Sequence, residues 1–121
     1  MMTATTTIMM ALALKHYMAD YLFNPLWTTP TNKHIYGSRG SLEHVGTHIV
    51  FCFICLVLFL PLDIVVYCML FDAFIHYHQD YFKTKWLYKR KDLSDRVRRA
   101  ITGGDQLVHI LTYITIVAWV T

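Results

Sequence analysis

Polar residues recur at a spacing of four positions inside mostly apolar stretches of this chain. The pairs are His16/Asp20, His44/His48, His76/Asp80 and Asp105/His109. Residues four apart fall on the same side of an α-helix, so each pair shares one helical face, and Asp72 extends the third pair by one more step. Ionisable side chains in apolar helices need partners or a metal ion, because burying them alone is costly. The pattern therefore predicts helices that meet around these pairs.

The apolar content of the chain indicates membrane helices. Of its 121 residues, 55% are apolar and only 16% are charged, and the mean hydropathy is +0.38. These values lie outside the usual range for soluble domains. A membrane-crossing helix needs about 20 mostly apolar residues, and the predicted spans are 3–23, 42–60, 62–82 and 104–121. We therefore predict an all-α fold, a four-helix transmembrane bundle that forms a single integral-membrane domain over residues 1–121.

A soluble helical bundle with a very apolar core is the alternative. The run from Val45 to Leu62 argues against it, because a helix so apolar on every side would have no face for water.

Three cysteines, Cys52, Cys55 and Cys68, lie in these apolar segments. Since no flanking basic residue would lower a thiol pKa, we interpret them as small buried side chains and not as a redox pair.

The basic residues indicate how such helices would be oriented. Residues 83–104 hold eight of the eleven lysines and arginines, and Lys33 and Arg39 fall on the same side of the predicted bundle. The positive-inside rule places that side in the cytoplasm and both termini outside. All the polar pairs lie close to that side. We therefore predict that the site and the basic loop face the cytoplasm.

A short interfacial amphipathic helix is predicted between the third and fourth spans. Its apolar positions are Leu93, Val97, Ala100 and Ile101. They recur at helical spacing opposite Arg96, Arg98 and Arg99, which would contact anionic lipid headgroups. The alternative is a solvated basic loop that only sets the topology. As partners we expect membrane lipids, and a membrane protein or a second copy of the chain, but no nucleic acid.

The polar pairs have the composition of a metal site. The predicted ligands are His16, Asp20, His44, His48, His76, Asp80, Asp105 and His109. Imidazoles and carboxylates without a thiolate suit Zn²⁺, Fe²⁺ or Mn²⁺. Because this set exceeds the needs of one ion, it predicts either two metal ions or one ion whose imidazoles are oriented by outer carboxylates. A hydrogen-bonded network without metal is the alternative.

These motifs also resemble those of a known family. They are H-x-x-x-D-Y at 16–21, paired histidines at 44 and 48, H-x-x-x-D-Y-x-K at 76–83 and D-Q-x-x-H at 105–109. The chain is similar over nearly its whole length to small, uncharacterised integral-membrane proteins of bacteria and phages, grouped as domain of unknown function 3307. It departs from them at Asn24, where that family often has Gln. The resemblance implies a prokaryotic inner-membrane location but no reaction.

The functional prediction is a metal-dependent hydrolase that acts on a lipid or a lipid-linked phosphate. The metal would activate water and polarise the phosphoryl oxygen, and Asp72 or Asp80 would be the general base. One alternative is a di-iron membrane oxidoreductase. Another is a non-enzymatic bacterial or phage protein that acts through a membrane partner. A metal or proton conduit fits less well, because the pairs lie at one depth.

Overall fold

The chain is all-helical in the residues that the structure describes. The computed structural model describes residues 1–23 and 33–121, and no strand occurs among them. The elements are α1 (Ala4–Tyr17), its π-helical continuation η1 (Met18–Phe23), α3 (Arg39–Leu56), α4 (Leu62–Lys89) and α5 (Asp95–Val120). With η1 counted as the end of α1, these are four helices, so the prediction of an all-α, four-helix fold is confirmed.

The helices begin where the sequence supplies a cap or a break. The hydroxyls of Thr3, Ser38 and Ser94 accept hydrogen bonds from backbone N–H groups in the first turns of α1, α3 and α5. Pro61 directly precedes α4, and its ring lacks the N–H that a continuous helix through α3 and α4 would need.

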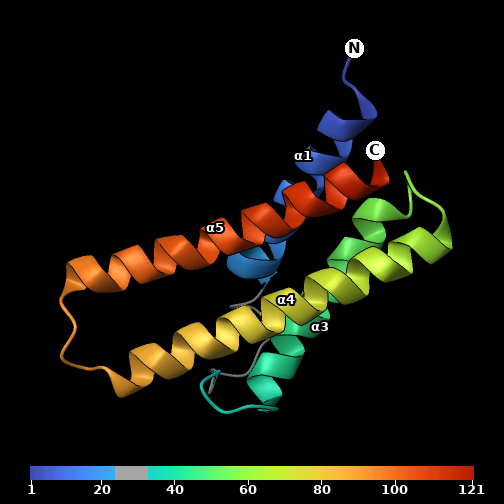
Figure 1. Cartoon of the computed structure of the whole chain (residues 1–121). Coiled ribbons are helices and arrows are strands. Elements are labelled where there is room, and N and C mark those ends of the chain that lie inside the picture. Colours follow the sequence, from blue (N-terminus) through green and yellow to red (C-terminus); the bar gives the residue numbers. More distant parts are fainter. Residues whose placement is uncertain (24–32) are drawn as a thin grey trace.

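The four helices pack in a closed ring. α1 contacts α3 and α5, and α4 contacts the same two helices. Figure 1 shows α4 and α5 running side by side in opposite directions and extending together beyond the other two helices toward their connecting turn. Both chain termini lie at the other end of the molecule (Figure 1). The interior of this ring is where side chains from all the helices meet.

The apolar core draws on every helix. Its buried members are Ile8, Leu12, Cys52, Leu56, Val65, Cys68, Tyr113, Ile116 and Val117. Burial raises the pKa of the Cys52 thiol to about 12, so this thiol stays protonated and behaves as an apolar side chain. The interpretation of the cysteines as small buried side chains is thus confirmed for Cys52 and Cys68, while Cys55 is only partly buried.

The prediction of membrane spans is wrong. Across residues 1–23 and 33–121, no helix combines the length and the apolar character needed to cross a membrane. This finding overturns the transmembrane bundle, the inner-membrane location, and the orientation with a cytoplasmic site and external termini. The physical reason is that no single helix among the described residues contains an apolar run of the required length. α1 has only 14 residues, and ionisable residues recur along the longer helices α4 and α5.

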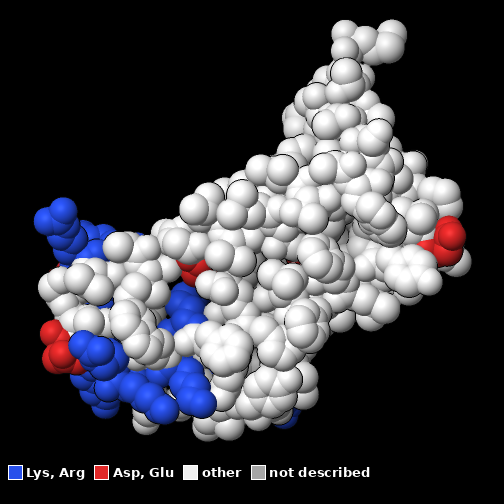
Figure 2. Space-filling view, viewed as in Figure 1, with Lys and Arg blue, Asp and Glu red and all other residues white. Residues whose placement is uncertain are grey.

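The interfacial helix does not exist as a separate element. α4 continues to Lys89 and α5 begins at Asp95, so the predicted amphipathic segment forms the first turns of α5. Figure 2 shows lysine and arginine side chains gathered at the end of the molecule where Figure 1 places the α4–α5 turn. Binding of anionic headgroups by Arg96, Arg98 and Arg99 stays a prediction.

Several large apolar side chains remain on the surface. Leu58 is 76% exposed, Tyr67 63% and Phe74 62%. Only some of the apolar residues of the sequence are therefore buried in the core. Contiguous apolar surface often belongs to an interface with another molecule, and association with a second copy or another protein stays a prediction.

Candidate metal centre

Histidine and aspartate side chains from all four helical segments converge inside the bundle. One group consists of Asp20, His44, His48 and His76, and a second of His76, Asp80 and His109. Within each group, one ligand atom per residue lies within 4.8 Å of every other. Asp20 comes from η1, whereas the histidines come from α3, α4 and α5. These buried groups could hold a metal ion.

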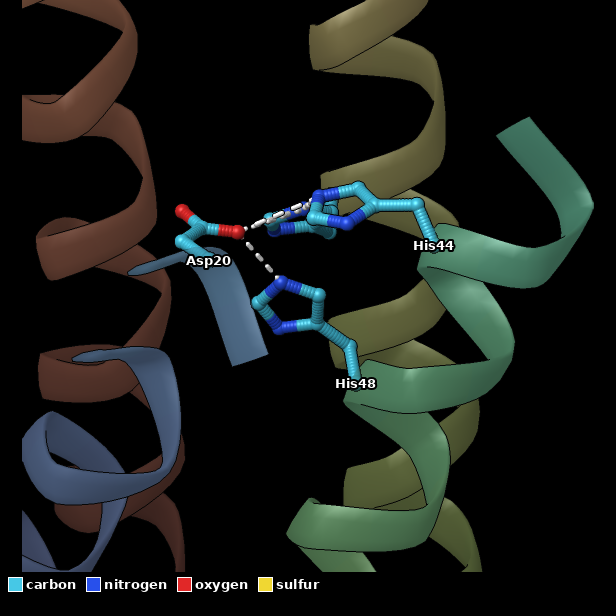
Figure 3. A group of neighbouring side chains, drawn as sticks. Asp20, His44 and His48 are labelled. Carbon is cyan, nitrogen blue, oxygen red and sulfur yellow. Dashed lines mark hydrogen bonds and ion pairs between the residues drawn. The ribbon is translucent and has the colours of Figure 1, made fainter. Parts of the chain in front are cut away.

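The first group surrounds one oxygen of Asp20. Asp20 Oδ1 lies 2.7 Å from His48 Nε2 and 3.1 Å from His44 Nε2, and Figure 3 shows it reaching from its helix toward both rings on α3. His76 Nε2 lies 3.1 Å from His44 Nε2 and 4.0 Å from Asp20 Oδ1. In a tetrahedral zinc site with bonds of about 2.0–2.1 Å, neighbouring ligand atoms are about 3.3 Å apart. The separations between these atoms, from 2.7 to 4.0 Å, lie on both sides of that value.

The carboxylate of Asp80 contacts both groups. Its Oδ2 lies 3.1 Å from His76 Nε2 and 3.4 Å from His44 Nε2. Its Oδ1 lies 3.5 Å from His109 Nε2, which in turn lies 3.4 Å from Asp105 Oδ1. The polar pairs of α3, α4 and α5 thus form one continuous cluster.

Asp20 is held on a π-helical turn. The α-helical hydrogen-bond pattern of α1 ends at Tyr17, and Met18–Phe23 form η1. A π-helix joins residues five apart instead of four, and such turns are frequent at functional sites. The wider turn keeps the Asp20 carboxylate 3.2 Å from His16 Nε2 while its other oxygen reaches His48 on α3.

The protonation states of the first group suit a metal ion. Burial alone would raise the pKa of the Asp20 carboxyl, but hydrogen bonds from His44 and His48 lower it far below its ordinary value. Burial lowers the pKa of His48 to about 3, and it does the same for His76. At neutral pH this group therefore offers an ionised carboxylate and, in His48 and His76, two neutral imidazoles, which are the forms that bind metals.

His109 differs from these neutral rings. Burial favours its neutral form, but the neighbouring carboxylates of Asp105 and Asp80 outweigh burial and raise its pKa to about 9. The pKa of His44 is also raised, because its hydrogen bonds to Asp20 and Asp80 outweigh burial. Both rings would have to release a proton before they bind an ion.

Packing restrains the imidazole rings. Within the described residues, the Nδ1 atoms of His44, His48 and His76 are buried and have no hydrogen-bond partner. In most metal sites this second nitrogen donates to a carboxylate or carbonyl. Here the rings stack instead, with centroids 3.7 Å apart for His48 and His76 and 4.2 Å apart for His76 and His109. The Nε2 atoms are consequently the ones that point into the cluster.

His16 lies beside the cluster and acts as a donor to it. Lys15 Nζ donates to the Tyr113 hydroxyl oxygen at 3.2 Å, and this hydroxyl lies 2.9 Å from His16 Nδ1. Because an ammonium only donates, the hydroxyl hydrogen is free to point at Nδ1, and the neutral ring then carries its hydrogen on Nε2. That nitrogen lies 2.7 Å from Gln106 Oε1 and 3.2 Å from Asp20 Oδ2. His16 thus orients Asp20 and is not placed as a ligand.

Asp72 lies outside both groups. Its carboxylate forms an ion pair with Lys15 Nζ, and both side chains are buried. Because Asp72 belongs to neither group of converging ligands, it is not positioned to remove a proton from water held there. Of the two predicted general bases, only Asp80 lies among the converging side chains.

Two lysines that the sequence analysis did not assign to the site lie beside Asp80. Lys33 Nζ is 3.5 Å from Asp80 Oδ2, and Lys83 Nζ is 3.6 Å from Asp80 Oδ1 and 2.7 Å from Asp105 Oδ2. Lys83 is the last residue of the H-x-x-x-D-Y-x-K motif, and its spacing of three from Asp80 was the signal that could have revealed it. Lys33 has no comparable signal in the sequence.

A small cavity adjoins the cluster on this side. It has a volume of about 10 Å³ and is lined by Lys33, Ser41, His44, Val45, His76, Tyr77 and Asp80. This is about the space that one water molecule or one ion occupies.

Two further histidines lie away from the cluster. His34 stacks on Tyr88, and His78 forms a hydrogen bond with the Tyr36 hydroxyl.

Comparisons with protein families, curated proteins and solved structures found no match to this chain. The resemblance to domain of unknown function 3307 therefore stays a prediction.

Proposed function

We propose that this chain binds a divalent transition-metal ion through Asp20, His44, His48 and His76. The observation that carries the proposal is the convergence of three imidazole Nε2 atoms and one carboxylate oxygen in a buried site. Buried polar groups need compensation, and an ion would satisfy all four ligand atoms at once. Ligands that come from separate helices would then tie the bundle together.

Zn²⁺ is the ion that these ligands fit best. Three imidazoles and one carboxylate form the mixed nitrogen and oxygen set that zinc accepts in tetrahedral geometry. Fe²⁺ and Mn²⁺ are the alternatives, because both bind imidazole and carboxylate ligands and both accept further ligands such as Asp80.

Hydrolysis of a phosphate ester is the second candidate function, and the two lysines favour it. Three carboxylates meet in the cluster, those of Asp20, Asp80 and Asp105, and Lys33 and Lys83 lie against them. With one divalent ion bound to the first group and His109 protonated, the positive charges exceed the negative charges by two. Such a site attracts an anion, and a metal ion beside lysine ammonium groups can stabilise the charge on a phosphoryl group.

Asp80 has the position of a proton acceptor in such a reaction. Burial would raise the pKa of its carboxyl, but interactions with His76, His109 and His44 keep it well below its ordinary value, so the group is ionised. It also lines the small cavity, next to the imidazoles. A water molecule bound to the metal there would lie within reach of this carboxylate.

Metal content and a matched pair of histidine variants test the binding proposal. The purified protein is stripped with a chelator, reloaded with Zn²⁺, dialysed and measured by inductively coupled plasma mass spectrometry. We expect bound zinc in the wild-type protein and in His78→Gln, whose ring lies outside the cluster, and at least a tenfold loss of affinity in His76→Gln. Equal affinity in the two variants, or no zinc in the wild type, would refute the proposal.

The hydrolase candidate has its own test. The zinc-, manganese- and iron-loaded proteins are assayed with p-nitrophenyl phosphate and its diester. We expect turnover that Asp80→Asn abolishes and a raised KM in Lys33→Gln. If the loaded protein shows no turnover of either ester, the hydrolase candidate is wrong and the metal-binding proposal is unaffected.

A further inference from the structure

We propose that Asp80, Asp105 and His109 form a subsite for a second divalent ion, and that Asp80 bridges the two ions. This inference rests on the proposed binding of a first ion by Asp20, His44, His48 and His76. It assigns the ligands of each ion and the order in which the ions bind.

Two buried atoms that face each other without a hydrogen bond point to the second subsite. His109 Nε2 and Asp105 Oδ1 lie 3.4 Å apart, and within the described residues neither makes a hydrogen bond. Both residues are only 1% exposed. They form an ion pair while His109 is protonated, and co-ligands of one ion lie at about this separation without bonding each other. The two atoms are thus arranged as two ligands of an ion.

Asp80 supplies the third ligand and the link to the first ion. Its Oδ1 lies 3.5 Å from His109 Nε2, while its Oδ2 lies 3.1 Å from His76 Nε2. The two oxygens therefore face different groups of imidazoles. Ions in paired metal sites are about 3.5–4 Å apart, a separation that one carboxylate can span with its two oxygens.

Lys83 makes the second subsite the weaker one. Its Nζ lies 2.7 Å from Asp105 Oδ2, the oxygen that would not bind the ion, and 3.6 Å from Asp80 Oδ1. The ammonium repels a second cation at short range in a poorly hydrated site. Within residues 1–23 and 33–121, no lysine forms an ion pair with Asp20 of the first subsite. The ions would therefore bind in order, with the subsite of Asp105 and His109 filled last.

Titration with Co²⁺ tests the number of ions and their order. Metal-free protein is titrated, bound cobalt is counted by mass spectrometry, and its visible bands are recorded. We expect two ions per wild-type chain with separable affinities, and one ion in Asp105→Asn and in His109→Gln, with the tighter phase retained. A His34→Gln/His78→Gln double variant should keep both ions, which excludes binding by the outer histidines.

A lysine pair provides the sharper comparison. Lys83→Gln removes the ammonium beside Asp105, and we expect the weaker phase to tighten on the order of tenfold or more. Lys85→Gln makes the same change two residues further along α4, where the side chain contacts the Tyr81 hydroxyl, and should leave both phases unchanged.

The outcomes separate the two proposals. Only one ion at saturating cobalt, or a weaker phase that survives in both Asp105→Asn and His109→Gln, would overturn the second subsite and leave the first intact. No bound ion at all would overturn the proposed metal-binding function itself. Circular dichroism of each variant verifies that the helical fold is retained before the ions are counted.

Discussion

Lys15 on α1 and Asp72 on α4 form an ion pair in the interior of the bundle, with side chains that are 0% and 2% exposed. Removing one partner leaves a buried charge without compensation, which costs about 3–5 kcal/mol. We therefore expect Lys15→Met to lower the free energy of unfolding by roughly that amount. The double variant Lys15→Met/Asp72→Leu should be more stable than Lys15→Met. Urea denaturation measures both, and additive losses would contradict a coupled pair.

The Tyr113 hydroxyl should matter for metal affinity although it lies outside the predicted ligand groups. Tyr113→Phe keeps the buried ring but removes the group that lies 2.9 Å from His16 Nδ1. The tautomer of His16, and with it the donor to Asp20, would no longer be fixed. Mutations of residues that orient a metal ligand typically lower the metal affinity 10–100-fold, which corresponds to about 1.4–2.7 kcal/mol of binding free energy. Competition with a chromophoric chelator measures this loss, and the exposed Tyr67→Phe is the control.

Removing the ion should destabilise the fold. An ion that binds only the folded chain adds about 2.7 kcal/mol when its free concentration is 100 times Kd. For a chain of this size, that corresponds to a fall in Tm of several degrees, on the order of 5–15 °C, after treatment with a chelator. Differential scanning calorimetry with and without zinc measures the shift. An unchanged Tm would show that the ligand atoms are satisfied without metal.

Metal affinity should rise with pH through neutrality. A metal binds neutral imidazole, while the pKa of His109, near 9, keeps that ring protonated at pH 7. Affinity at the subsite with His109 is therefore expected to fall below pH 9 by up to tenfold per pH unit. His48 and His76, with pKa values near 3, are neutral throughout this range. Binding isotherms at pH 6.5, 7.5 and 8.5 test the slope, and the His109→Gln variant should lose this pH-dependent phase together with the second ion.

The sequence predicted the four helices and the residues that meet between them, because a spacing of four is a direct property of the α-helix. Each His/Asp pair lies on one helical face, and antiparallel helices bring those faces together. The structure places Asp20, His44, His48, His76, Asp80, Asp105 and His109 in one cluster, with His16 beside it. Whether the cluster binds metal stays a prediction.

Other features could not be predicted from the sequence. Mean hydropathy does not distinguish apolar residues that face a core, a partner or lipid, so it led to the wrong prediction of membrane spans. Asp72 shares the spacing of His76 and Asp80, yet it pairs with Lys15, which lies 57 positions earlier in the chain. Contacts between residues so distant in sequence depend on how the helices pack, and no periodicity within one helix encodes them.

The π-helical turn at Met18–Phe23 makes the register of this segment as important as its composition. A wider turn accommodates one residue more than an α-helix does. Deleting a single residue between His16 and Asp20 would shorten their spacing to three and move Asp20 by about 100° about the helix axis relative to His16. The Asp20 carboxylate would then point away from His48 even though no side chain at the site had been changed. At this position, the length of the chain is itself a determinant of the site.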